Sequence, residues 1–94
     1  MAKALKGHKI ARFDLIPWDC MWRVAERYGA GTELYADRGW EEGYEWGKAI
    51  AALHRHMAQF CMANEEEDHL AAVVFYALAL MRFEESYLEG DDRG

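Results

Sequence analysis

The feature that most constrains the fold is an apolar run of twelve residues, LAAVVFYALALM, at positions 70–81. This run is too short to cross a bilayer, which takes about 20 helical residues. In a helix predicted from about Glu67 to Tyr87, its large apolar side chains fall on more than one face. A helix that is apolar nearly all round must be surrounded by protein, so we expect it inside a helical core.

The chain is short for a protein that must enclose such a helix. Its 94 residues make a single domain near the lower size limit for independent folding. Two partner helices would barely cover a third that is apolar on most sides. We therefore expect oligomerisation, as a dimer or tetramer, to complete the fold.

Two further helices are predicted before this run. The first begins near Pro17 and ends at Gly29–Gly31, because proline suits a first helical turn and glycine a helix end. The second runs from about Glu45 to the acidic run at 65–68. Their apolar side chains recur every three or four residues. They are Trp18, Met21, Trp22, Ala25 and Tyr28 in the first, and Trp46, Ile50, Leu53, Met57, Phe60 and Cys61 in the second.

These segments predict an all-α fold, a small helical bundle of three main helices plus a short one at 32–35. Residues 1–16 form a basic N-terminal arm, and residues 17–88 form a single α-helical domain. Residues 89–94 are a polar tail that is expected to fray. The sequence shows no internal repeat and no alternation typical of strands.

Charge is distributed unevenly along the chain. The net charge of −6 argues against a general nucleic-acid binder. Residues 1–30 carry six Lys/Arg against three Asp/Glu, a balance of +3, whereas residues 31–94 carry five against fourteen, a balance of −9. The acidic part is either a solvated surface or a place that holds a divalent cation, which needs clustered carboxylates.

Cysteine usage and missing motifs narrow the class of protein. Cys20 and Cys61 are too few for a disulfide framework, although a single disulfide stays open. Their positions near apolar faces predict buried structural thiols rather than nucleophiles. With no signal peptide, the expected context is a reducing cytoplasm without membrane attachment. The sequence has no glycine-rich phosphate loop, CxxC pair, HExxH or GxSxG motif.

The first candidate site is the acidic run EEED at 65–68 with His69 after it. Hard divalent cations prefer several carboxylate oxygens. Consecutive helical residues diverge by about 100°, so at most two or three of these acids can share one ion. The alternative is that the charges only stabilise the start of the following helix.

The second candidate site is HRH at 54–56. His54 lies at the edge of the apolar stripe and is expected in the core or at an interface. Arg55, on the polar side, can clamp a phosphate through its planar fork. His56 can neutralise a phosphate or move a proton. A plain surface position for the last two residues is the alternative.

The third candidate site is the segment YADRGWEEGYEW at 35–46. The indole rings of Trp40 and Trp46 can stack on a nucleobase, and Arg38 can meet a phosphate. The same residues can also form a lid that seals a small core. Physical chemistry alone favours the lid.

Four blocks of the sequence follow one another in a recognisable order. They are GHKIARFDLIPWDCMWRVAERYG (7–29), GTELYADRGWEEGYEW (31–46), AALHRHMAQF (51–60) and HLAAVVFYALAL (69–80). Together they resemble the phage and bacterial dATP/dGTP diphosphohydrolase family, which is related to the MazG-type all-α nucleotide pyrophosphohydrolases. The matching signature residues are Gly31, Tyr35, Arg38, Trp40 and Gly43 in the second block, and Arg55 and His56 in the third.

The resemblance implies hydrolysis of purine (deoxy)nucleoside triphosphates to monophosphate and pyrophosphate, with Mg²⁺ or Mn²⁺ held by acidic residues of a helical bundle. It also implies a phage-encoded protein that works in the host cytoplasm. The residues that it implies are Glu65, Glu66, Asp68 and His69 for the metal, Arg55 and His56 for catalysis, and Lys9, Arg12, Arg38, Trp40 and Trp46 for the nucleotide.

The chain departs from the family pattern where a polar, metal-facing surface is expected. Gly39 replaces an asparagine, Ala72 replaces a histidine, and Tyr76 stands where asparagine or histidine is usual. The acidic segment is shortened to NEEEDH at 64–69. These changes support a second hypothesis, a catalytically degenerate relative that binds a nucleotide signal or inhibits a host protein such as a defence protein. A purely structural or assembly role is the third hypothesis.

Overall fold

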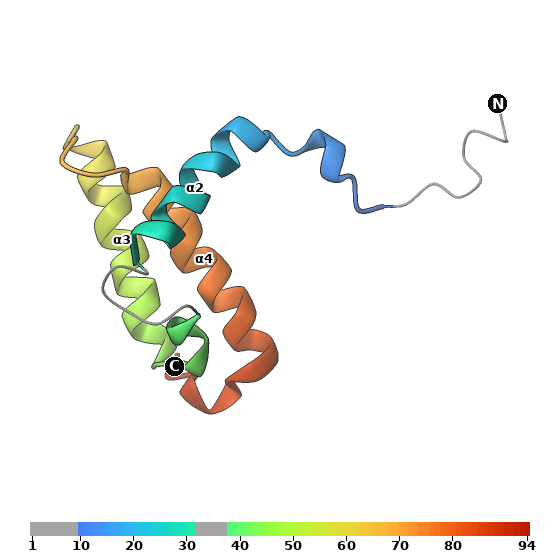
Figure 1. Ribbon diagram of the computed structural model, residues 1–94. Coiled ribbons are helices and arrows are strands. Elements are labelled where there is room, and N and C mark those ends of the chain that lie inside the picture. The colour runs from blue at the N-terminus through green and yellow to red at the C-terminus, as the bar shows by residue number, and fades with distance from the viewer. Residues whose placement is uncertain (1–9, 32–37) are drawn as a thin grey trace, which may run out of the picture.

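The computed structural model describes residues 10–31 and 38–94, which form three α-helices and three short 3-10 turns (Figure 1). The elements are η1 (Phe13–Leu15), α2 (Trp18–Gly31), η2 (Gly39–Glu42), α3 (Trp46–Cys61), α4 (His69–Ser86) and η3 (Leu88–Gly90). These described residues contain no strand. The predicted all-α class is confirmed, whereas the short helix expected at 32–35 lies outside the described residues.

The centre of the molecule is a helix pair. α3 and α4 run antiparallel side by side, joined by the loop 62–68, and α2 crosses α4 (Figure 1). The turn η2 also contacts α4, towards the other end of the pair. The segment before α2 points away from the helix pair (Figure 1).

Small side chains form the contact between α3 and α4. Ala49 on α3 and Ala72 and Ala79 on α4 are fully buried. The distance between two packed helices depends on the side chains at the contact, and an alanine adds only a methyl group. We infer from this burial that the two helices approach each other along these alanines, which we call the alanine seam.

An aromatic core closes the end of the pair where α3 begins. Phe83 is fully buried, with its ring centroid 5.1 Å from that of Tyr44 and 6.0 Å from that of Tyr87. Trp46 is 3% exposed and donates its indole N–H to the Tyr87 carbonyl at 3.0 Å. Gly43 has φ 96°, and a Cβ at this position would stand 2.7 Å from the Tyr87 ring. Only glycine suits that turn, because it tolerates positive φ and leaves room for the ring.

The residues after α4 fold back onto the start of α3. The backbone N–H of Gly47 donates to Asp92 Oδ1 at 2.8 Å, and the Arg93 guanidinium lies 4.6 Å from the centre of the Trp46 ring. Gly90, two residues before Asp92, is buried. The tail is thus attached to α3, in contrast to the fraying expected from its polar sequence.

The helix α4 begins two residues later than predicted. Asp68 is its N-cap, and the carboxylate accepts a hydrogen bond from the Ala71 backbone N–H at 3.1 Å. An N-cap residue has a non-helical backbone, so the acids before it belong to the loop. From His69 to Leu80 each residue is buried or half-buried, as expected for a helix surrounded by protein.

The buried face of α3 differs from the predicted apolar stripe. Met57 and Phe60 are 38% and 48% exposed, and Cys61 is exposed, whereas His56 is only 1% exposed. His56 lies seven residues after Ala49, so both fall on the side that meets α4. The C-terminal half of the predicted stripe is therefore wrong, because close approach along the alanine seam decides the orientation of α3.

Two further burial predictions are wrong, because the thiols of Cys20 and Cys61 are exposed rather than buried. His54, expected in the core or at an interface, is exposed and therefore outside the core, and its place at an interface stays a prediction. His54 lies two residues before His56, so the orientation that buries His56 turns His54 away.

The helix α2 also presents an unexpected face to the core. Its buried residue is Val24, with Tyr28 half-buried, whereas Trp18 and Trp22 are 56% and 71% exposed. The reason is its placement: α2 crosses α4 with its C-terminal half, so its first turns extend beyond the helix pair (Figure 1).

Within the described residues, no helix is both long and apolar enough to cross a membrane.

Candidate functional site

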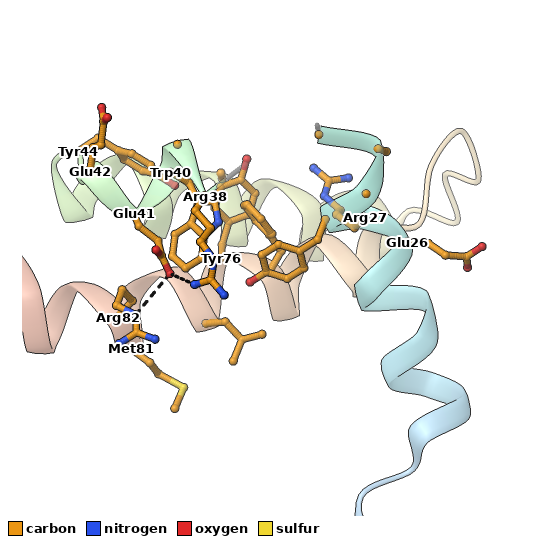
Figure 2. Close-up of a pocket in the computed structure, with 18 of the residues that line it drawn as sticks. Glu26, Arg27, Arg38, Trp40, Glu41, Glu42, Tyr44, Tyr76, Met81 and Arg82 are labelled. Carbon is orange, nitrogen blue, oxygen red and sulfur yellow. Dashed lines mark hydrogen bonds and ion pairs between the residues drawn. The ribbon is translucent and has the colours of Figure 1, made fainter. Parts of the chain in front are cut away.

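A groove of about 1820 Å³ runs between α2, η2 and α4 (Figure 2). One wall is aromatic and combines Tyr28 from α2, Trp40 from η2 and Phe75 from α4. The ring centroids are 4.8 Å apart for Tyr28 and Phe75, 6.0 Å for Tyr28 and Trp40, and 6.1 Å for Trp40 and Phe75. The rings are tilted by 56–62° to one another, so a flat aromatic ligand can stack on the face of one of them and meet the edges of the others.

The local structure of η2 positions two groups of this groove. Arg38 has a left-handed backbone, φ 58°, and its carbonyl accepts the Glu41 N–H at 2.9 Å. The single turn that follows leaves Arg38 exposed and Trp40 half-buried against Phe75. One short turn therefore supplies both a cation and an indole ring to the groove.

Charged side chains line the same groove, five cations and five carboxylates, and several of them are paired with one another. Glu41 accepts a hydrogen bond from Arg38 at 3.0 Å and lies 3.8 Å from Arg82, and Figure 2 shows its carboxylate between the two guanidinium groups. The Arg27 guanidinium lies 6.0 Å from the centre of the Phe75 ring. Guanidinium groups beside an aromatic wall can recognise a ligand that carries both a ring and phosphates.

Two phenols border the groove in neutral form. Burial raises the pKa of Tyr44 to about 12. Burial also raises the pKa of Tyr28, and the nearby Glu41 carboxylate adds to this effect. Both hydroxyl groups are therefore protonated near pH 7 and can donate hydrogen bonds.

A histidine cluster lies where α3 ends and α4 begins. His56 and His69 are 1% and 3% exposed, and their Nδ1 atoms are 2.9 Å apart. Glu67 Oε1 lies 3.9 Å from His56 Nδ1, so the three side chains bring ligand atoms within 4.8 Å of one another. The cluster borders the groove, because Arg27 donates to Glu67 at 2.8 Å and Tyr76 stacks on His56 at 5.9 Å.

Hydrogen bonds define which nitrogens of the cluster carry protons. Asn64 Oδ1 accepts the backbone N–H of Glu66 at 3.1 Å, and it also lies 2.7 Å from His69 Nε2, which therefore donates to it. With Nε2 as the donor, Nδ1 of His69 can accept a hydrogen bond from His56 Nδ1–H. Burial lowers the pKa of His56, which keeps that ring neutral near pH 7.

Asp68 is already engaged outside the cluster. Arg23 makes two hydrogen bonds to its carboxylate, at 2.8 and 2.7 Å, and lowers the pKa of Asp68 to about 2. Arg27 likewise lowers the pKa of Glu67 through its hydrogen bond. Both carboxylates are therefore ionised, but only Glu67 lies with the histidines.

The donor atoms of the cluster do not fit Mg²⁺. They are two imidazole nitrogens and one carboxylate oxygen. Mg²⁺ is bound in proteins through oxygen ligands with near-octahedral geometry. Glu65 and Glu66, which the sequence suggested as carboxylate ligands, are exposed and do not belong to the cluster.

Comparison with known protein families shows to which family the chain is related. Residues 2–93 match the family model described as dATP/dGTP diphosphohydrolase, N-terminal. The chain belongs to this diphosphohydrolase family. No curated protein and no solved structure matches it. The family relationship predicted from the four sequence blocks is thus confirmed.

The structure brings together part of the residue set that the diphosphohydrolase resemblance implies. Arg38 and Trp40 meet in the groove, and His69 meets His56 in the cluster. Neither His56 nor Arg55 lines the groove. Arg55 is exposed, with Nη2 3.5 Å from His56 Nε2.

Other residues of the implied diphosphohydrolase set lie elsewhere. Trp46 is part of the aromatic core, and Arg12 pairs with Asp14 at 2.7 Å in the segment before α2. Lys9 lies outside the described residues. The nucleotide set therefore does not converge on one place in the structure.

Sequence reasoning did not single out several residues of the two sites. Glu67 is one of four adjacent acids, and nothing in the local sequence distinguishes it from its neighbours. Asn64 resembles an ordinary loop residue, although it orients His69. Arg27, Tyr28 and Phe75 reach the groove only through the crossing of α2 and α4, which no local pattern encodes.

Proposed function

We propose that the protein hydrolyses purine (deoxy)nucleoside triphosphates to a nucleoside monophosphate and pyrophosphate. The observation that carries this proposal is the groove, where an aromatic wall and guanidinium groups from separate elements face the same space. The name of the family, which refers to dATP and dGTP, supports purine deoxynucleotides as the substrate class.

The aromatic wall would receive the base. Trp40 would supply the π-face, with the tilted rings of Tyr28 and Phe75 beside it. Stacking of a base on an aromatic side chain contributes about 1–3 kcal/mol. A purine, with two fused rings, covers more of such a wall than a pyrimidine does.

The arginines would receive the phosphates. Arg38 and Arg82 share Glu41, which holds their planar groups at the edge of the groove. Mg²⁺ or Mn²⁺ would arrive on the phosphate oxygens of the substrate, and the Glu41 carboxylate offers a further oxygen ligand. Water attacks the α-phosphorus, the bond to the oxygen that bridges the α- and β-phosphates breaks, and one proton of the water passes to solvent. Pyrophosphate leaves while the guanidinium groups offset the negative charge on its oxygens.

The test is a panel of dNTPs and NTPs, each with Mg²⁺ or Mn²⁺, with the products separated by chromatography. Trp40→Ala should raise KM for the preferred purine triphosphate about tenfold, because it removes a stacking surface. Trp22→Ala is the matched control, since Trp22 is 71% exposed and does not line the groove. If no triphosphate yields monophosphate above the buffer rate, the hydrolase proposal is wrong.

A specific observation favours a second candidate, a phage-encoded protein that binds without hydrolysis. Arg55 and His56, the pair that the resemblance implies for catalysis, lie outside the groove, and Ala72, in place of a family histidine, is fully buried in the seam. The groove would then sequester a nucleotide signal, or the protein would inhibit a host protein. Calorimetry with a non-hydrolysable dGTP analogue separates the cases: binding that needs Trp40, without turnover of dGTP, supports this second candidate.

A further inference from the structure

We infer that His56, Glu67 and His69 form a binding site for a first-row transition metal ion that prefers imidazole ligands, such as Zn²⁺, rather than for Mg²⁺. The inference stands on the chemistry of the three donors and does not depend on the proposed hydrolysis. Imidazole suits Zn²⁺, Fe²⁺ and Ni²⁺, whereas sites built from carboxylates and water suit Mg²⁺.

The two imidazole rings already converge as ligands of one ion. With metal–nitrogen bonds of about 2.0–2.1 Å, two nitrogens on one ion lie roughly 3.0–3.4 Å apart. The Nδ1 atoms of His56 and His69 are 2.9 Å apart. Because His56 Nδ1 carries the proton of that contact, an ion that takes its place requires the neutral ring to move this proton to Nε2.

The third donor sits on the accessible side of the pair. The Glu67 side chain is 44% exposed, while both histidines are almost fully buried. An ion can therefore enter past Glu67. Glu67 Oε1 lies 3.9 Å from His56 Nδ1, and a small rotation of the Glu67 side chain would bring this oxygen close enough to share one ion with the histidine. Three protein ligands leave at least one position for water, as in open zinc sites.

A shell of outer contacts orients the three donors. Asn64 Oδ1 accepts the Nε2–H of His69, so Nδ1 is the free nitrogen that points to His56. Arg27 holds Glu67 Oε1 at 2.8 Å, and the Tyr76 ring stacks on His56. Histidine ligands of metals in proteins are held by similar hydrogen bonds from the second ring nitrogen.

The site would tie the end of α3 to the start of α4. His56 and His69 lie on different helices, and Glu67 lies in the loop that joins them. An ion bound to all three stabilises the folded chain, because the unfolded chain does not hold these ligands together.

The experiment uses the metal-free full chain carrying Cys20→Ser and Cys61→Ser, since both thiols are exposed and also bind zinc. Calorimetry with Zn²⁺ and with Mg²⁺, in the absence of nucleotide, measures stoichiometry and affinity. We expect one Zn²⁺ per chain and at least a hundredfold preference over Mg²⁺. Tm should rise by about 10–20 °C at a hundredfold excess of Zn²⁺ over Kd.

Substitutions locate the ion. Glu67→Gln and His69→Asn should each weaken Zn²⁺ binding at least tenfold, and Asn64→Ala about 10–100-fold because it releases the His69 ring. Glu66→Gln and His54→Asn are matched controls with exposed side chains outside the cluster, and they should keep the parent affinity. Far-UV circular dichroism verifies that each variant is folded.

Two results would overturn the inference. One is a similar affinity for Zn²⁺ and Mg²⁺, which would mean that the imidazoles are not ligands. The other is unchanged Zn²⁺ affinity in Glu67→Gln and Asn64→Ala, which would place the ion elsewhere and leave the histidines as a hydrogen-bonded pair. Since the readouts are affinity and Tm, inactivity towards nucleotides would not affect the result.

Discussion

At the scale of single residues, one charged pair holds the chain terminus in place. Asp91 accepts two hydrogen bonds from the Arg93 guanidinium, both at 2.8 Å, and this guanidinium covers the Trp46 ring. The same contact with Arg93 lowers the pKa of Asp91 to about 2. The carboxylate thus orients a cation that shields the aromatic core.

This pair should make stability depend on pH in acid. Because the pKa of Asp91 is lower in the folded chain, its contribution is complete above its ordinary pKa of 3.8 and disappears as pH falls towards about 2. Asp91→Asn should therefore lower Tm at pH 5, and the difference from the parent should vanish near pH 2. Thermal melts between pH 2 and 5 measure this, with Glu89→Gln, also exposed, as the control. A difference that stays constant over this range would contradict the assigned role.

At the scale of elements, the alanine seam decides how α3 and α4 face each other. The helices themselves were predictable, because apolar spacing, Pro17 and the glycines are local signals. The buried face of α3 was not, since the larger side chains of Met57 and Phe60 outweigh the alanines in any hydrophobicity pattern. Close packing, which favours small residues at the contact, overrides that pattern.

Enlarging a seam residue should therefore be costly. Ala79→Leu adds three carbons at a fully buried position and should lower the free energy of unfolding by about 1–3 kcal/mol. Ala51→Leu is the matched control, because Ala51 is exposed on α3 and should change stability by less than about 0.5 kcal/mol. Urea titration monitored by circular dichroism gives both values. Equal costs at the two positions would mean that the seam is not closely packed.

At the scale of the whole molecule, the described chain leaves many apolar side chains in water. Phe13, Leu15, Trp18 and Trp22 are 56–71% exposed along the segment that points away from the helix pair (Figure 1). Contiguous exposed apolar surface of this kind is typical of interaction sites. This exposed apolar surface adds to the expectation, based on the short chain, that oligomerisation completes the fold.

Light scattering after size exclusion at micromolar concentration should give the mass of a dimer or tetramer. Trp18→Ser combined with Trp22→Ser should shift the protein to monomer, because both indoles lose their apolar contact area. Met62→Ser is the control, since Met62 is 78% exposed but lies in the loop after α3. A monomeric parent protein would show that the described fold is sufficient by itself.

The sequence by itself determined the α-helical class, the three helices and the family, because each depends on residues that are close along the chain or in a fixed order. It also pointed to Arg38, Trp40, His56 and His69, although with roles that the structure rearranges. Only the tertiary structure showed that Glu67 lies beside the two histidines. It also showed that the aromatic side chain of Tyr28 on α2 packs against Trp40 of η2. The physical reason is that such meetings depend on helix orientation and crossing, which close packing of small residues sets and no local pattern records.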